Sequence, residues 1–413
     1  MKLRFLGAAR EVGRSGVLLD AGKRILFDYG MKVGEKNEFP LQAPSGIDAV
    51  VLSHAHLDHT GSSPALYEKA NPPCFLTPPT ADLASLLLKD SLKVCRLKGE
   101  RAPFSQFHLK KMERAVIPLG YGRQFPLSRD SSLTFFDAGH VPGSAIAQVY
   151  SQHKRIVYTG DFKMEATRMH RGAEPVENCD VLVIESTYED HDHPDRPKLE
   201  KRIAEEARET MDGGGSVLFP AFAVGRSQEL LMLVDDLLPG AQAYIDGMSK
   251  TATEIAAAHP QYLRNAKALR KAMRDAEWVE TDGQRRKAAE EPSVIISSAG
   301  MLEGGPALTY LLKLNERSKI ILTGYQVEGT NARSLLEKKR VVIDNSQYEV
   351  TIPTEYLDMS AHAGRSDLLA FVKRANPEKV FCIHGDKCEE FAEALRGMGF
   401  DAKAPRLGDS FEL

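Results

Sequence analysis

Short apolar segments separated by turns fill the first half of the chain. Each is a brief run of Val, Ile, Leu or Phe between Gly, Asp, Lys or Arg, which is typical of β-strands. Two neighbouring pairs are joined by the polar loops AGKR and SQHKR and predict β-hairpins. With a helical pattern at 81–94, we expect mostly antiparallel strands with helices packed outside them, an α/β sandwich. The predicted strands are 2–6, 17–19, 25–27, 49–53, 133–136, 145–150, 156–158 and 181–185.

The pattern changes near residue 189. The polar, proline-bearing stretch YEDHDHPDRP indicates a domain junction, and a long helical pattern follows at 198–211. Apolar strands such as SVLFPAF, AYIDG, SVIISSA and KIILTGY then alternate with helices, which is typical of a parallel α/β domain. Hairpin-like sequence returns at RVVIDNSQYEV. We therefore predict one domain interrupted by another, with 1–188 and 346–413 forming the host and 189–345 the insert.

Composition narrows the classes of protein that fit. The 413 residues include 54 Lys and Arg against 57 Asp and Glu, a net charge of -3 that excludes a strongly basic nucleic-acid binder but not a local basic patch. No run of about 18 apolar residues occurs, so no membrane span is expected. The polar start of the chain does not resemble a secretory signal. The 5 cysteines are scattered without a CxxC pair, which favours reduced thiols and a cytoplasmic location.

The most informative motif directly follows the strand DAVVL. It reads SHAHLDH and places His54, His56, Asp58 and His59 within six positions. Imidazole and carboxylate groups are the ligands that hydrolytic metal ions use. His54 and His56 flank one residue and can face one ion, whereas Asp58 and His59, where the chain turns into a helix, can face a second.

A metal site needs further ligands, and three candidates follow predicted strands elsewhere. His140 comes after LTFFDAG, Asp161 after RIVYTG and His384 after KVFCI. Asp28, after RILF, has no histidine beside it, so we expect it to orient a ligand rather than to bind metal itself.

These motifs together resemble a known family. HAHLDH, His140 and Asp161 resemble the metal motifs of the metallo-β-lactamase fold, and Glu185 in VLVIESTY, His362 in MSAHAG and His384 in CIHGD resemble the additional motifs of the β-CASP nucleases. PAFAVGRSQEL, SSAGMLEGGP and TGYQVEGTNAR resemble the insert of that family. The chain is most similar to archaeal and bacterial relatives of the cleavage and polyadenylation specificity factor nuclease subunit, with ribonuclease J next. The resemblance implies an αββα sandwich with an inserted parallel α/β β-CASP domain.

The resemblance also implies a role for each matching residue. Two Zn²⁺ ions would be bound, one by His54, His56 and His140 and the other by Asp58, His59 and His384, with Asp161 bridging them. The implied catalytic residues are His362, Glu185, Asp58 and Asp28. In this set His362 serves as general acid or as a hydrogen-bond donor to a phosphate oxygen, and Glu185 holds its ring. Asp58 is a metal ligand and Asp28 orients one. A histidine at position 384 is typical of the family members that process RNA.

The implied substrate is single-stranded RNA, for which several contacts are candidates. Ser360 and Gly385 flank metal residues and can present a hydroxyl or a backbone N–H to a phosphate. Arg226 and Arg333 are candidate phosphate clamps, with structural salt bridges as an equal alternative. The charged segment 264–286 fits either an RNA-contacting face or a solvated helix face.

Several alternatives stay open from the sequence. The chain can be a zinc-dependent ribonuclease, a small-molecule hydrolase of the same fold, or a non-catalytic RNA-binding subunit of a processing complex. Endonuclease and 5′-to-3′ exonuclease activity both occur in the family, as do homodimers, and manganese can replace zinc. The leucine before Asp58 favours a place among the relatives of the cleavage and polyadenylation specificity factor nuclease subunit.

Overall fold

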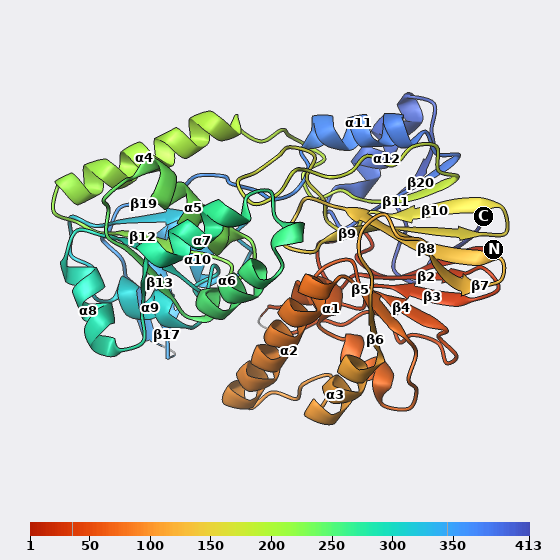
Figure 1. The fold of residues 1–413 in the computed structure, drawn as a ribbon, viewed down its shortest axis with the longest axis horizontal. Helices are drawn as coiled ribbons and strands as arrows, with labels where there is room; N and C mark the ends of the chain where they lie inside the picture. Colours follow the sequence, from red (N-terminus) through yellow and green to blue (C-terminus); the bar gives the residue numbers. More distant parts are fainter. Residues whose placement is uncertain (35, 345) are drawn as a thin grey trace. The chain divides into compact units, whose positions relative to one another are not determined.

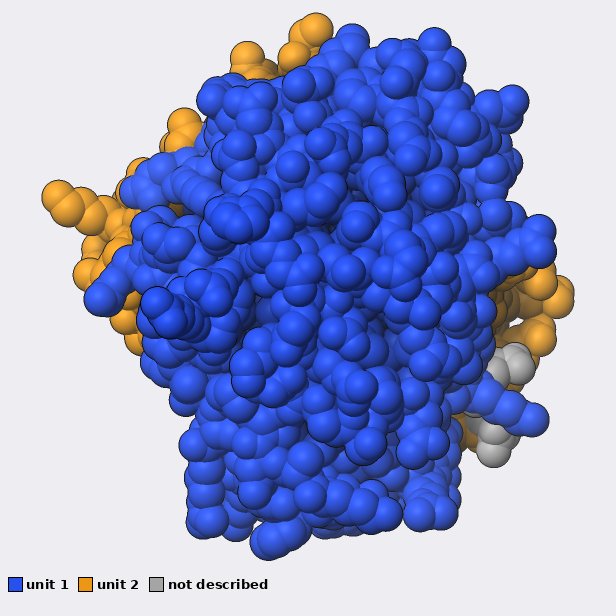
Figure 2. Space-filling view, turned by 90° about the vertical axis from the view of Figure 1, so that its right-hand side faces the viewer, with its two compact units in different colours: residues 1–166, 171–192, 361–413 blue, residues 167–170, 193–360 orange. Residues whose placement is uncertain are grey.

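The computed structural model describes residues 1–34, 36–344 and 346–413, which form two compact units. Unit 1 comprises residues 1–166, 171–192 and 361–413, and unit 2 comprises residues 167–170 and 193–360 (blue and orange in Figure 2). Every predicted metal ligand lies in unit 1. None of the helices in the described ranges is long and apolar enough to cross a membrane.

Two seven-stranded sheets, counted over the described residues, form the centre of unit 1 (Figure 1). The first has the order β22 (Ser410–Glu412), β1 (Lys2–Gly7), β2 (Gly16–Asp20), β3 (Arg24–Phe27), β4 (Ala49–Val51), β5 (Cys74–Leu76) and β6 (Val116–Pro118). The second has the order β21 (Asp401–Lys403), β20 (Lys379–Ile383), β11 (Val181–Glu185), β10 (Lys154–Tyr158), β9 (Ala145–Ser151), β8 (Ser131–Asp137) and β7 (Phe125–Ser128).

The two sheets of unit 1 face each other across one apolar core. Side chains alternate along each strand, so Val17 and Leu19 of β2 join this core while Leu18 points to the opposite face. Phe135 and Val183 enter the same core from the second sheet. On the outer face of the second sheet pack α11 (Arg365–Ala375) and α12 (Cys388–Gly397). The short α1 (Leu57–Thr60), α2 (Pro78–Lys98) and α3 (Gln106–Ala115) belong to the side of the first sheet (Figure 1). This confirms the predicted αββα sandwich.

The expectation of mostly antiparallel strands was wrong for half of each sheet. The hairpins β2–β3 and β9–β10 are antiparallel as predicted. However, β3, β4, β5 and β6 run parallel to one another, as do β10, β11, β20 and β21. The physical reason is connection length. Strands joined by tight turns must run antiparallel, whereas the longer connections after β3 and β10 allow the chain to cross over before the next strand.

Unit 2 is built on one parallel sheet. Its order is β14 (Glu277–Trp278), β13 (Ala243–Asp246), β15 (Val294–Ser297), β12 (Val217–Pro220), β16 (Lys319–Leu322) and β19 (Thr354–Tyr356). The α-helices and the other two strands described in unit 2 are α4 (Arg196–Asp212), α5 (Arg226–Leu237), α6 (Met248–Ala258), α7 (Ala266–Asp275), α8 (Asp282–Glu290), α9 (Pro306–Leu311), α10 (Asn331–Lys338) and the hairpin β17 (Arg340–Ile343)–β18 (Ser346–Glu349).

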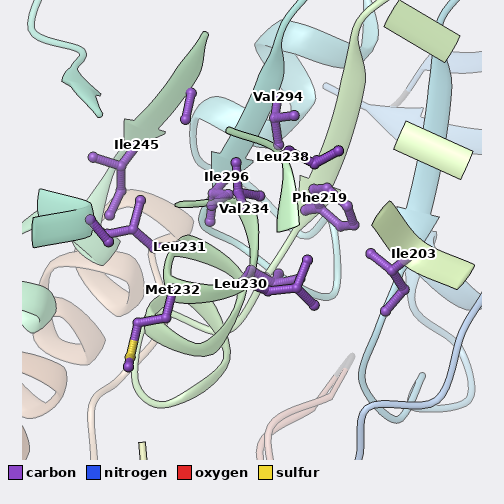
Figure 3. Packing of buried hydrophobic residues seen from close by; sticks show 14 of the residues in the cluster. Ile203, Phe219, Leu230, Leu231, Met232, Val234, Leu238, Ile245, Val294 and Ile296 are labelled. Carbon is purple, nitrogen blue, oxygen red and sulfur yellow. The ribbon is translucent and has the colours of Figure 1, made fainter. Parts of the chain in front are cut away.

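Helices cover both faces of the sheet in unit 2, so its strands are apolar on both sides. Phe219 and Ile296 pack against Leu230 and Val234 of α5 on one face (Figure 3). The adjacent residues of the same strands point to the other face, where α8, α9 and α10 cover them. This arrangement is the parallel α/β insert expected from the sequence.

The chain passes between the units at positions that differ from the predicted 189 and 345. Unit 2 runs from His193 to Ser360 and also takes residues 167–170, while Asn345 lies outside the described residues. The later end has a clear cause. Strand β19 pairs in parallel with β16, so the segment that carries it belongs to the sheet of unit 2.

Candidate metal centre

The HxHxDH motif follows β4, a completely buried strand, and its last two ligands lie in α1. His54 Nε2 lies 3.1 Å from His56 Nδ1, and His140 Nε2 lies 3.2 Å from the same atom. Asp161 Oδ2 is 3.7 Å from His54 Nε2 and 3.8 Å from His140 Nε2. The ligand atoms of these four residues all lie within 4.8 Å of one another, as one bound cation requires.

A second ligand group shares one member with the first. His59 Nε2 lies 3.2 Å from Asp161 Oδ2 and 3.7 Å from Asp58 Oδ2. His384 Nε2 is 3.3 Å from Asp58 Oδ2, and its Nδ1 is 3.4 Å from Asp161 Oδ1. These ligand atoms also lie within 4.8 Å of one another. Asp161 therefore belongs to both groups, and each of the other six ligand positions expected from the sequence lies in one of them.

The chemistry of these residues fits bound cations. Among the described residues, His59 Nε2 and Asp161 Oδ1 are buried and have no hydrogen-bond partner, an arrangement that costs free energy unless another group satisfies them. Burial, reinforced by neighbouring histidines, holds the pKa of His54 and of His140 well below the usual value, which favours the neutral imidazole that a metal ion binds. His140 Nδ1 donates to the carbonyl of Ala361 (2.9 Å), which leaves Nε2 for the site.

Asp28 is completely buried behind the second ligand group. Its Oδ2 accepts hydrogen bonds from His59 Nδ1 (2.7 Å), Ser53 Oγ (2.7 Å) and Tyr158 Oη (2.8 Å), and its Oδ1 accepts one from Ser53 N (2.7 Å). The bond to Nδ1 fixes the imidazole tautomer that directs Nε2 of His59 toward the other ligands. Asp28 and His384 both have positive φ, of 52° and 51°, which is uncommon outside glycine and often marks functional sites.

His362 and Glu185 form a pair beside the ligand groups. His362 Nδ1 donates to Glu185 Oε2 (2.9 Å), and its ring centroid lies 4.7 Å from that of His140. Glu185 is itself held in place, since Oε1 accepts from the backbone N–H of Phe162 (2.8 Å) and Oε2 from Thr187 Oγ1 (2.6 Å). Burial by itself lowers the pKa of His362, but the carboxylates of Glu185 and Asp161 outweigh it and raise that pKa to about 9.

Several residues of this site were not found from the sequence. Ser53 and Tyr158 bond Asp28, and the Thr187 hydroxyl lies 3.2 Å from His384 Nδ1. The buried Lys163 donates to the carbonyl of His362 (3.3 Å). Ser53 and Thr187 stand next to or near predicted site residues in the sequence, which was a usable signal, whereas nothing in the local sequence marks Lys163.

The candidate substrate contacts divide between the units. Gly385 lies in unit 1, where a Cβ would come within 2.2 Å of the Ser186 carbonyl oxygen, so this position requires glycine for packing. Ser360, Arg226 and Arg333 lie in unit 2. Arg333 is half exposed and its Nε lies 2.6 Å from Glu337 Oε1, an ordinary ion pair along one helix.

The charged segment 264–286 is largely explained by contacts inside unit 2. Arg264 and Arg270 donate to the backbone carbonyls of Thr167 and Ala257. Lys271 and Arg285 pair with neighbouring aspartates, which are Asp235, Asp275, Asp246 and Asp282. These contacts favour the interpretation of the segment as a structural and solvated face.

Comparison with known families agrees with this geometry. The beta-lactamase superfamily domain matches residues 17–217, the Beta-Casp domain matches 227–335, and the Zn-dependent metallo-hydrolase RNA specificity domain matches 348–405. A protein of unknown function from Enterococcus faecalis has a similar fold, with a TM-score of 0.63, 14% identity and coverage of 100% of this chain and 99% of its own.

Curated relatives match over nearly the whole chain. The probable RNase MJ4 of Methanocaldococcus jannaschii is 37% identical over 100% of both chains. RNase aCSPSF2 of Saccharolobus solfataricus is 36% identical over 100% of this chain and 85% of its own. The transcription termination factor FttA of M. jannaschii is 36% identical over 96% of this chain and 69% of its own. The family predicted from the motifs is thereby confirmed, and the chain belongs to the β-CASP family of metal-dependent ribonucleases with the metallo-β-lactamase fold.

Proposed function

We propose that the protein is a zinc-dependent ribonuclease that hydrolyses phosphodiester bonds of single-stranded RNA. The observation that carries this proposal is the pair of ligand groups that share Asp161 and lie beside the His362–Glu185 pair. Relatives that are named RNases support RNA as the substrate. The five cysteines are all free and buried, which agrees with a reducing cytoplasm.

The ligand set favours two zinc ions. His54, His56 and His140 would hold one, Asp58, His59 and His384 the other, and Asp161 would contact both. Nitrogen-rich sites with carboxylates suit zinc better than they suit manganese or magnesium. When bound, such ions neutralise phosphate charge and lower the pKa of a coordinated water toward neutrality.

The residues around the ligands supply orientation and a proton. In the proposed reaction, a water oxygen forms a bond to phosphorus and the water gives up a proton to solvent, while the bond to the leaving 3′ oxygen breaks. The ring of His362, held through Nδ1 by Glu185, presents Nε2 as the donor that gives a proton to the leaving oxygen. The products would carry a 5′-phosphate and a 3′-hydroxyl. Asp28 contributes by holding the ring of His59.

Substrate contacts are proposed at four positions. Ser360 would offer its hydroxyl and Gly385 its backbone N–H to a phosphate, and Arg226 and Arg333 would act as phosphate clamps. For Arg226 the supporting feature is its place at the first residue of α5. For Arg333 the ion pair with Glu337 gives an alternative structural role. We propose that the protein can act either as a monomer or as a homodimer.

The proposed activity is tested by cleavage of RNA by the pure protein. We expect phosphodiester cleavage that a chelator abolishes and added Zn²⁺ restores. His362→Ala should keep its bound metal and lose about 10²–10⁴-fold in kcat/KM, since it removes only the proton donor. His153→Asn is the matched control, because His153 lies in the β9–β10 turn with φ of 64°, a conformation that asparagine tolerates.

Two results would contradict the proposal. The absence of chelator-sensitive RNA cleavage by the wild type would refute a ribonuclease, and cleavage of thioesters or lactams instead would indicate a small-molecule hydrolase. Bound zinc and RNA without turnover would indicate a non-catalytic subunit.

RNA labelled at the 5′ end and bearing a triphosphate, monophosphate or hydroxyl then distinguishes endonuclease from 5′-to-3′ exonuclease activity. Monophosphate-dependent release of mononucleotides means an exonuclease, and internal fragments independent of the 5′ group mean an endonuclease.

A further inference from the structure

Positive charge gathers in unit 1 on the second half of α2, the loop after it and α3. Residues 89–114 contain eight Lys or Arg and three Asp or Glu, a local net charge of +5 (8 minus 3) in a chain whose net charge is -3. We call the exposed part of this region the α2–α3 surface, defined by Lys93, Arg96, Leu97, Lys98, Arg101, Phe107 and Lys110. None of these residues takes part in the metal centre.

The α2–α3 surface lies at the end of α2 that is remote from the ligands. The first turn of α2 is tied to the loop that carries His140, because the hydroxyls of Thr77 (2.6 Å) and Thr80 (2.9 Å) both donate to the carbonyl of Gly143. The helix continues for 21 residues, about 30 Å at 1.5 Å per residue. Ser85 and Lys89 contact Glu113, which joins α3 to its side (Figure 1). The surface is therefore separated from the metal centre by about one helix length.

A hollow and two exposed apolar side chains complete the α2–α3 surface. The hollow has a volume of about 540 Å³ and is lined by Lys89, Lys93 and Arg96 together with Leu92 and Ala102. Leu97 is 76% exposed and Phe107 is 65% exposed. The ammonium group of Lys111 lies 5.7 Å from the centroid of the Phe107 ring. A flat, exposed aromatic ring among cations is the combination on which a base of a single strand stacks.

Most cations of the α2–α3 surface form no ion pair, although the carboxylate of Glu100 also lines the hollow. Within the described parts of the chain, Arg96, Lys98, Arg101 and Lys110 form no ion pair, in contrast to Lys271 and Arg285 of the segment 264–286. Unpaired positive charge on an exposed surface attracts polyanions, and each phosphate bound releases counterions.

We propose that the α2–α3 surface is an accessory site for single-stranded RNA. It binds backbone phosphates of the strand outside the catalytic centre through Lys93, Arg96 and Lys110, and one base stacks on Phe107. The proposal rests on the proposed ribonuclease function for the identity of the polymer. It implies that long RNA is bound more tightly than RNA too short to span α2.

The test compares two RNA lengths with matched charge variants. An RNA of about 3 nucleotides is shorter than α2 even when the strand is fully extended, whereas one of about 30 nucleotides can reach the surface. The variant is Lys93→Ala/Arg96→Ala/Lys110→Ala. The control is Lys267→Ala/Arg274→Ala/Arg286→Ala, which removes the same charge from exposed positions of unit 2.

We expect the surface variant to raise KM for the long RNA on the order of tenfold and to leave kcat/KM for the short RNA within about twofold. The slope of log affinity against log salt should become shallower by about 2, since three contacts to a single strand contribute about 0.7 each. Phe107→Ala should weaken binding of the long RNA without changing this slope, because it removes stacking and no charge. The control variant should behave as the wild type.

Equal effects on both RNA lengths, an equal loss in the control variant, or unchanged affinity and salt slope for the long RNA would each overturn the accessory site. Unchanged RNA binding combined with lost binding of an acidic protein would assign the surface to that partner instead and would also overturn it. If the wild type cleaves neither RNA, the ribonuclease function fails, and fluorescence anisotropy with the long RNA still decides whether the surface binds it.

Discussion

The hydrogen bonds of Asp28 allow a sharp prediction about metal binding. Asp28 accepts four hydrogen bonds, three at Oδ2 from His59, Ser53 and Tyr158 and one at Oδ1 from the Ser53 amide. The Asp28→Asn side chain has nearly the same shape but only one acceptor oxygen. If that oxygen takes the Oδ2 position, its NH₂ group faces the N–H of Ser53, and one buried donor loses its partner. This costs about 1–3 kcal/mol of folding free energy.

The same substitution should weaken metal binding. A neutral amide accepts the Nδ1–H of His59 less strongly than a carboxylate does, so Nε2 becomes a weaker ligand and the ring is held less firmly. Changes of this kind typically reduce metal affinity about 10–100-fold, which is about 1.4–2.7 kcal/mol. Competition with a chromophoric chelator measures the zinc affinity of each protein, and metal analysis after dialysis counts the ions retained.

Tyr158→Phe is the matched control for Asp28→Asn. It removes one of the three donors at Oδ2 but keeps the carboxylate, its contact with His59 and the aromatic stacking of Tyr158 on Phe27. We expect its metal affinity to change less than about threefold, since the loss is one hydrogen bond away from the ligand. Wild-type zinc affinity in Asp28→Asn, or equal losses in both variants, would refute the argument that the Asp28 carboxylate acts through His59.

Three further predictions concern other parts of the structure. Glu229→Gln should lower the free energy of unfolding by about 1–3 kcal/mol in a urea titration, because it removes the carboxylate that pairs with the buried Arg196 at 2.9 Å, which keeps Glu200 as its second partner. Burial lowers the pKa of His170 to about 4, so its contribution to stability is complete above its unfolded pKa of about 6.5 and is lost as the pH falls toward 4. This loss amounts to about 3 kcal/mol. In urea titrations at several pH values across that range, the free energy of unfolding of His170→Gln should therefore depend less on pH than that of the wild type. Gly385→Ala should reduce activity or stability, since its Cβ would lie 2.2 Å from the carbonyl oxygen of Ser186, and a near-wild-type Tm and kcat/KM would contradict this.

The local parts of this protein were accessible from the sequence. Strands such as β11 appear as apolar runs because both faces of a central strand are buried, and its observed bounds equal the predicted 181–185. The motif around His54 was equally clear, since its ligands are only a few residues apart and one loop can bring them together. Helix α2 was expected over 81–94, but it extends to Pro78–Lys98 because Thr77 caps its start and Gly99, with φ of 68°, ends it.

The pairing of strands and side chains that are far apart in the chain could not be predicted from the sequence. The parallel halves of both sheets in unit 1 and the place of β19 beside β16 depend on which strands meet after long crossovers. The contact of Lys163 with His362 joins residues 199 positions apart. The charges of segment 264–286 could not be interpreted until the partners of Arg264 and Arg285 were known.

The sequence by itself therefore indicated many of the strands and helices, the family and the residues expected as metal ligands, because apolar periodicity and ligand type are properties of short segments. Only the tertiary structure decided which ligand Asp28 holds, namely His59, and which cations of α2 and α3 form no ion pair within the described residues. The reason is physical. Hydrogen bonds and ion pairs act over about 3–4 Å, so their partners are set by where the packed core brings the chain together and not by distance along the sequence.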